Sequence, residues 1–241
     1  MIVSEIMTTR LVTVAADDTL SHAANLLRQF QIHQLPVVRQ VHTTEHETWK
    51  SWLLLEGLLT LQDIDVAMAV EKSSSSSDLL RREWQEQRVA EVMHRATIRV
   101  TPTTNVAAAA QILVERGLNA LPVVEYEDTE HETQTVLVGL LTRSDLLIAL
   151  ARSMGAFEPG MQLIIDLPLG DLTPLAQTLL LAKQLHVQVR SIMAAPLEGG
   201  VPRTATLRLG TINPAPLLVR LQEAKIEYTF ADSLAEGDID V

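Results

Sequence analysis

One sequence unit occurs twice in this chain of 241 residues. Each copy contains a methionine, a Leu-Pro-Val-Val segment and a Gly-Leu-Leu-Thr-x-x-Asp segment, which are Met7, 35–38 and 57–63 in copy one and Met93, 121–124 and 139–145 in copy two. The offset between copies is 86 residues at the methionines (93 − 7) and 82 at the final aspartates (145 − 63), so one loop differs in length. An internal repeat constrains the architecture before any other feature. Two copies are too few for a solenoid and suit two half-domains that bury their sheets against each other.

The Thr-x-x-Asp end of each glycine-led segment has a structural and a functional interpretation. An apolar helical stretch follows it, so Thr60 and Thr142 are predicted to cap helices, with Asp63 and Asp145 in the first turn. The same atoms suit a nucleotide, because free N–H groups at a helix start attract phosphate and a nearby carboxylate can accept ribose hydroxyls. The leading glycine would let such a ligand approach the backbone. Because the whole set is duplicated, a nucleotide site is the favoured hypothesis.

At this point the chain resembles the cystathionine-β-synthase (CBS) domains, which occur in tandem pairs. The resemblance covers residues 1–152 and rests on the opening methionine with Thr13-Val14 or Arg99-Val100, the Leu-Pro-Val-Val strand and the glycine-led segment, in the same order twice. It implies a β-α-β-β-α unit per copy, packed sheet to sheet. It also implies two clefts that commonly bind adenosine-containing ligands.

The same resemblance assigns site residues position by position. Thr60 and Thr142 are similar to phosphate contacts, and Asp63 and Asp145 to ribose contacts. Contacts to the base are implied at two residues of the opening strands, Val12 and Ile98.

The two clefts are expected to differ, with that of Asp145 the better site. After the threonine, copy two has Arg143 where copy one has Leu61, so only one cleft gains a cation near the phosphates. Before Leu-Pro, copy two has Ala120 where copy one has Gln34, and alanine leaves room for a flat base.

Composition narrows the possible partners. The net charge of −11 argues against nucleic-acid binding and against anionic membrane surfaces. The chain has no cysteine, which fits a reducing cytosol, and no signal peptide or long apolar span is visible. We therefore expect a cytoplasmic protein.

Each copy carries an insertion after its Leu-Pro-Val-Val strand, and both insertions contain Thr-Glu-His-Glu-Thr, at 44–48 and 129–133. Neither His46 nor His131 has a second histidine four residues on, as metalloprotease helices require. We interpret both insertions as solvated hairpin tips and expect no metal site. Between the copies, Trp84 is predicted to anchor the linker on copy one.

The character of the chain changes after Arg152. A turn-rich junction leads into a strand-helix-strand-strand-helix-strand order, the ferredoxin-like split unit, with Thr173-Pro174 as a helix start. This order resembles ACT domains, regulatory modules that often bind amino acids. The whole arrangement resembles the B-type acetoin-utilisation proteins. ACT ligand loops usually contain Pro-Gly, whereas here Leu175 follows the proline, so oligomerisation is the favoured role and amino-acid binding the alternative.

The predicted fold is α+β, a tandem CBS pair followed by a ferredoxin-like ACT-type domain. The expected domains are copy one at 1–72, a flexible serine-rich linker with a short helix at 73–88, copy two at 89–152, the junction at 153–160, the ACT-like domain at 161–233 and an acidic tail at 234–241.

No nucleophile with a base, carboxylate pair or metal set is recognisable, so we expect no catalytic residue and no enzyme. The favoured function is a regulatory protein that senses an adenine nucleotide (AMP, ADP, ATP or a related adenosyl ligand), with no other cofactor. The alternatives are a small enzyme of acetoin or nucleotide metabolism with a site between domains, and a non-binding oligomeric scaffold. We also expect a homodimer formed through the repeat helices, 21–30 and 106–116, because they carry more apolar surface than one pair can cover. The regulated partner is unknown.

Overall fold

The computed structural model describes residues 1–45, 48–73, 83–95, 98–128, 133–194, 200–211 and 213–230. The chain divides into two compact units, Met1–Leu146 (unit 1) and Leu147–Val241 (unit 2). This division falls inside helix α5 (Arg143–Ser153), earlier than the domain boundary predicted at residue 152.

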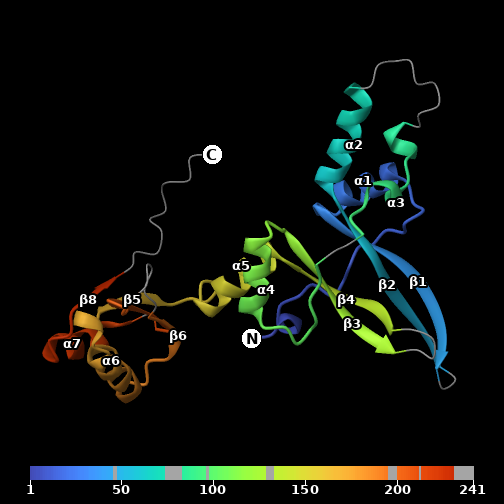
Figure 1. Ribbon diagram of the computed structural model, residues 1–241. Helices are drawn as coiled ribbons and strands as arrows, with labels where there is room; N and C mark the ends of the chain where they lie inside the picture. Colours follow the sequence, from blue (N-terminus) through green and yellow to red (C-terminus); the bar gives the residue numbers. More distant parts are fainter. Residues whose placement is uncertain are drawn as a thin grey trace. The chain divides into compact units, whose positions relative to one another are not determined.

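Unit 1 contains two β-hairpins, each flanked by helices (Figure 1). Copy one contains α1 (Leu20–Gln29), β1 (Gln34–Glu45), β2 (Thr48–Thr60) and α2 (Leu61–Ser73), and copy two contains α4 (Val106–Glu115), β3 (Ala120–Asp128), β4 (Thr133–Thr142) and α5. Short helical turns are η1 (Val3–Glu5), η2 (Trp84–Glu86) and α3 (Val89–Val92). The order helix-strand-strand-helix therefore occurs twice, as the repeat predicts.

The two hairpins belong to one sheet. Both are antiparallel, and both shift register between the two valines of Leu-Pro-Val-Val. A single pair, Leu54 with Val136, joins them in the order β1-β2-β4-β3. The expectation of two separate sheets is therefore wrong, although the hairpins do bury Val38, Val124 and Leu137 in a shared cluster.

The opening strand of each repeat is reduced to one parallel bridge. Val14 and Val100 each bridge to the first valine of the following Leu-Pro-Val-Val segment. The chain turns immediately afterwards, where the side chains of Asp18 and Thr104 accept a hydrogen bond from the amide that follows the bridge, at 2.8 and 3.0 Å. These local turns explain why the predicted strand does not extend.

The opening turn of each copy packs into the core of the other copy. Val3 in η1 is fully buried in the cluster of copy two, which includes Leu113. Val89 in α3 is fully buried in the cluster of copy one, which includes Leu27. Burying a side chain of this size stabilises the fold by about 1.5–3 kcal/mol, so each copy depends on the other for part of its core.

The packing of each opening segment against the opposite copy explains why glycine occurs at positions 57 and 139. A Cβ atom on Gly57 would lie 2.7 Å from the carbonyl oxygen of His94, and one on Gly139 would lie 2.5 Å from the Sδ atom of Met7. Both neighbours belong to the opening segment of the opposite copy. The glycines therefore admit another part of the chain, and the expectation that they admit a ligand is corrected.

Two predictions about the linker and insertions have different outcomes. Trp84 packs against the core cluster of copy one, which confirms its predicted anchoring, in a 3₁₀ turn. Most of the serine run, His46 and His131 lie outside the described residues.

Unit 2 contains a four-stranded antiparallel sheet and two helices (Figure 1). Its elements are β5 (Met161–Asp166), η3 (Pro168–Gly170), α6 (Thr173–Gln184), β6 (Val189–Met193), β7 (Thr204–Leu209), α7 (Ala215–Glu223) and β8 (Tyr228–Phe230). The strand order β6-β7-β5-β8 places the first strand between the third and the fourth, as in the ferredoxin-like split unit. Alternate strand residues such as Leu163 and Leu207 are buried with Ala182 of α6 and Leu221 of α7.

The junction after α5 is bound to the sheet of unit 2. The Oγ atom of Ser191 donates to the carbonyl of Met154 at 3.0 Å, and the guanidinium of Arg208 donates to the carbonyl of Glu158 at 2.6 Å. The carboxylate of Glu158 also forms an ion pair with Arg190 at 2.7 Å. The turn-rich segment thus belongs structurally to unit 2.

Candidate functional site

Thr60 and Thr142 each close a capping box. Thr60 N and Oγ1 donate to Asp63 Oδ2 at 2.8 and 2.7 Å, and Asp63 N donates back to Thr60 Oγ1 at 3.2 Å. Thr142 and Asp145 repeat this arrangement at 2.8, 2.7 and 3.1 Å. The predicted caps are confirmed, and each contributes about 1 kcal/mol to stability. Their ligand contacts remain a prediction.

The second oxygen of each aspartate distinguishes the copies. Asp63 Oδ1 lies 2.9 Å from Nε2 of His94, whereas Asp145 Oδ1 accepts a hydrogen bond from Thr8 Oγ1 at 3.3 Å. His94 and Thr8 occupy equivalent positions, each directly after the opening methionine of the opposite copy. Equivalent backbones thus present different side chains to the two carboxylates.

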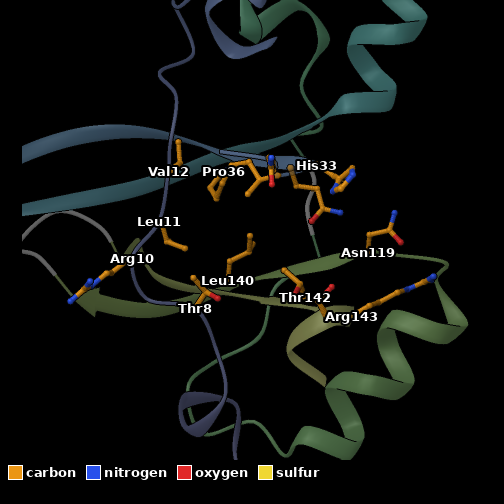
Figure 2. Close-up of a pocket in the computed structure, with 14 residues that line it drawn as sticks. Thr8, Arg10, Leu11, Val12, His33, Pro36, Asn119, Leu140, Thr142 and Arg143 are labelled. Atoms are coloured by element: carbon orange, nitrogen blue, oxygen red, sulfur yellow. The ribbon is translucent and has the colours of Figure 1, made fainter. Parts of the chain in front are cut away.

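A cavity of about 500 Å³ lies at the start of α5 (Figure 2). It is lined by Thr8, Arg10, Leu11, Val12, Gln31, Ile32, His33, Gln34, Pro36, Asn119, Leu140, Thr142, Arg143 and Ser144. Leu11, Val12, Ile32, Pro36 and Leu140 make one part of its lining apolar. The threonines, Ser144, and the two arginines supply hydroxyl groups and positive charge.

The cavity combines the two copies. Val12, on an extended segment of copy one, lines the same space as Thr142 and Arg143 of copy two. Ile98 and Ala120, which were expected beside Asp145, are not among its lining residues. Asp145 itself is not among them either, although Thr142, which it caps, is. Neither Ile98 nor Ala120 lines the smaller cavity beside Thr60, so their contacts to a ligand remain a prediction.

Because Ile98 and Ala120 do not line the cavity beside Thr142, the expected difference in room between the two clefts does not rest on them. Ala120 is buried and Ile98 is 40% exposed, and neither can make the cavity beside Thr142 roomier. Gln34, expected to crowd the poorer cleft, lines both the cavity beside Thr142 and the cavity beside Thr60. The cavity beside Thr60 measures about 250 Å³ and includes Asn119. Residues 96–97 lie outside the described residues.

Two arginines flank the larger cavity. Figure 2 shows Arg10 and Arg143 at its opposite ends, with Thr142 between them. The guanidinium of Arg143 donates to the carbonyls of Leu118 at 2.7 Å and Leu113 at 3.5 Å, near the end of α4. These bonds fix its position beside the start of α5.

Thr8, Arg10 and Gln31 were missed by the sequence interpretation. Arg10 could have been found, because the position 86 residues later is Ala96, so the arginine departs from the repeat. Gln31 has a φ of 52°, in the left-handed region that is uncommon for residues other than glycine. Its counterpart Gly117 has a φ of 63° and adopts this conformation without strain.

Within the described ranges, no three His, Cys, Asp or Glu side chains gather closely enough to hold a metal ion. Among the helices of that same part of the chain, none is long and apolar enough to cross a membrane.

The profile of the CBS domain matches residues 3–69 and 89–152, more than half of the chain. The chain belongs to the CBS domain family. Its two matched stretches are copy one and copy two, so the tandem CBS pair inferred from the repeat is confirmed. Both stretches end before β5, the first strand of unit 2.

Known proteins with CBS domains are similar to this CBS pair. The CBS domain-containing protein YhcV of Bacillus subtilis is 27% identical over 146 residues, which are 61% of this chain and 83% of YhcV. Among solved structures, the protein described as acetoin utilization protein AcuB from Vibrio cholerae has 24% identity and a TM-score of 0.46, covering 66% of this chain and 98% of its own. CBSX2 of Arabidopsis thaliana, solved in complex with AMP, has 23% identity and a TM-score of 0.44, covering 63% and 96%.

Proposed function

We propose that this protein is a regulatory sensor that binds an adenine nucleotide, or a related adenosyl ligand, in the cavity beside Thr142. The observation that carries the proposal is the composition of that single space of about 500 Å³. It combines an apolar wall, the start of a helix and two arginines. Small-molecule pockets commonly measure about 300–1,000 Å³ and have mostly apolar walls with a few polar groups.

The lining suggests an orientation for the ligand. The flat base packs against Val12, Pro36 and Leu140, while the phosphates face the start of α5 at Thr142 and Arg143. Helix starts favour anions because their N–H groups point outward and the dipole is positive there. The ribose hydroxyls then lie near Asp145, whose Oδ2 is already used by the cap.

The local charge supports an anionic ligand. The chain as a whole carries a formal charge of −11, yet this cavity contains Arg10 and Arg143. In the sequence of the opposite copy, Leu61 stands at the position of Arg143, and Ala96, which lies outside the described residues, stands at the position of Arg10. We therefore expect the cleft beside Thr142 to bind phosphate-bearing ligands more tightly. The proposed residues of the other cleft are Thr60, Asp63, Ile98 and Ala120.

Calorimetric titration tests the function directly. AMP, ADP, ATP and S-adenosylmethionine are titrated into the full chain, and each mixture is then assayed for turnover. Saturable heat without product supports a sensor, product formation supports the enzyme alternative, and no heat with any ligand overturns the proposal in favour of a scaffold.

Signal transmission would pass through α5. This helix starts beside the cavity and ends at Ser153, and the junction that follows is hydrogen-bonded to unit 2 through Ser191 and Arg208. A sensor requires that the ligand distinguish two states of such an element. The ACT-like module is the proposed receiver of the signal.

Nucleotide binding is expected to slow hydrogen exchange at the amides of residues 147–158, beyond those that line the cavity. The physical reason is that fixing the first turn of α5 reduces the local opening of the turns that follow it. Hydrogen-exchange mass spectrometry with and without ADP measures this. Protection confined to cavity residues would leave binding intact and exclude transmission through α5.

The ACT-like assignment of unit 2 remains part of the proposal. Its first strand-to-helix loop has Leu169 fully exposed with a φ of 54°, and Asp171 accepts bonds from Thr173 Oγ1 at 2.7 Å and N at 2.9 Å. Two hydrogen bonds from Thr173 lower the pKa of the Asp171 carboxyl. The bond from the Thr173 side chain has the larger effect, and the bond from its backbone N–H adds to it. We propose that unit 2 acts in oligomerisation, with amino-acid binding as the alternative.

We expect the chain to form a homodimer through apolar surface on the helices of the CBS pair. Within the stretches expected to carry it, 21–30 and 106–116, Leu27 is buried inside the unit, whereas Phe30 is 48% exposed and Val114 is 76% exposed. Val66 in α2 is also 56% exposed, and Leu147 in α5 is 66% exposed. Symmetric interfaces bury such surface.

Light scattering is expected to give about twice the chain mass of 26.6 kDa. The double variant Val66→Glu with Leu147→Glu should lower the mass towards that of one chain, and any dimer that remains is held by unit 2. A wild-type monomer at micromolar concentration would contradict the homodimer.

A further inference from the structure

The two capping aspartates differ in the oxygen that remains for a ligand. In both copies Oδ2 accepts bonds from the N and Oγ1 atoms of the capping threonine, so Oδ1 is the oxygen left for a ribose hydroxyl. In copy one the imidazole of His94 lies 2.9 Å from Asp63 Oδ1. In copy two a hydroxyl, that of Thr8, lies 3.3 Å from Asp145 Oδ1.

These contacts differ in strength. A hydroxyl-to-oxygen hydrogen bond has an ordinary length of about 2.7–2.8 Å, so the Thr8 contact is long and easily released. A ring N–H donating to a carboxylate at 2.9 Å is a charge-assisted bond, roughly twice as strong as a neutral one. The side chain of Asp63 is 14% exposed, and the His94 ring that covers its Oδ1 atom is 66% exposed.

The backbone holds both contacts in equivalent places. His94 exchanges two backbone hydrogen bonds with Leu58, at 2.9 and 3.0 Å, and Thr8 exchanges two with Leu140, both at 2.9 Å. The residue after each opening methionine is therefore aimed at the aspartate of the opposite copy. Only the identity of the side chain decides whether that carboxylate is occupied by a ring or by a hydroxyl.

We infer that His94 is a specificity-determining residue that closes the cleft of Asp63, so that the chain binds one adenine nucleotide, in the cleft of Asp145. This inference rests on the proposed nucleotide-binding function. His94 competes with the ribose for Asp63 Oδ1, whereas Thr8 yields its place on Asp145 or turns to share the ribose contact.

The inference is tested by exchanging the side chains at the two equivalent positions, His94 and Thr8. Equilibrium dialysis with radiolabelled ADP is expected to give one site per wild-type chain and two per chain in His94→Thr. Thr8→His is expected to weaken binding at the single site by at least about tenfold, since it places the ring on Asp145. His94→Gln, which retains an N–H donor, is expected to keep one site. Thermal melts establish that each variant is folded.

The outcomes separate this inference from the proposed function. One site in both wild type and His94→Thr, with unchanged affinity in Thr8→His, overturns the inference and leaves the sensor intact. Binding of two equivalents of ADP to wild type with equal affinity also overturns the inference and leaves the sensor intact. Absence of ADP binding in wild type and in His94→Thr, with none of the other adenosyl ligands bound, overturns the proposed function and the inference with it.

Discussion

Replacing Gly57 with alanine is expected to lower the free energy of unfolding of unit 1 by about 2 kcal/mol, within the 1–3 kcal/mol typical of overpacking. The added Cβ would lie 2.7 Å from the carbonyl oxygen of His94 and 3.0 Å from the Sδ atom of Met93. A side chain such as methionine can rotate away, but the carbonyl is held by a backbone bond from Leu58 at 3.0 Å. The strand and the opening segment of copy two must therefore separate.

Gly139→Ala is the matched control. The three heavy atoms nearest to its Cβ would all belong to the Met7 side chain, with Sδ at 2.5 Å. Methionine has three rotatable bonds and adapts to such changes, so the cost should be below about 1 kcal/mol. Urea unfolding followed by tryptophan fluorescence measures both variants, because Trp49, Trp52 and Trp84 all lie in unit 1. Equal destabilisation by the two variants would contradict the packing explanation.

Replacing Asp145 with alanine is expected to weaken ADP binding by roughly 10- to 100-fold, the effect of losing a hydrogen bond to a charged group worth about 1.5–3 kcal/mol. The carboxylate is the proposed acceptor for the ribose. It also orients the Thr142 hydroxyl, which donates to Asp145 Oδ2 at 2.7 Å and lines the cavity. Calorimetric titration at fixed ionic strength measures the change, because salt screens the contribution of Arg10 and Arg143.

Asp63→Ala separates binding from capping. It removes the same capping bonds from α2, so both variants should lose about 1 kcal/mol of stability. Only Asp145→Ala should lose affinity, because copy one has Leu61 where copy two has Arg143, and Asp63 Oδ1 is already in contact with His94. If both variants bind ADP like wild type, the aspartates are caps alone. If Asp63→Ala loses more affinity, the order of the two clefts is reversed.

Features that depend on neighbours in the sequence could be read from the sequence alone. The duplicated unit predicted two copies of one fold unit, and its resemblance to CBS domains indicated a CBS pair. The capping boxes at Thr60 and Thr142 were also predictable, because their bonds span three residues. In unit 2, the alternation of apolar and polar residues and Pro174 at a helix start indicated the ferredoxin-like order, which the strand order β6-β7-β5-β8 matches.

The pairing between the copies was decided only by the tertiary structure. Asp145 meets Thr8 across 137 residues, and Val12 lines the same cavity as Thr142 of the other copy. A repeat cannot reveal this, because pairing within a copy and pairing between copies satisfy the same local pattern of turns, strands and caps. Burial of Val3 and Val89 in the opposite cores selects the exchanged arrangement. That choice places Arg10 and Arg143 at one cavity and His94 on Asp63.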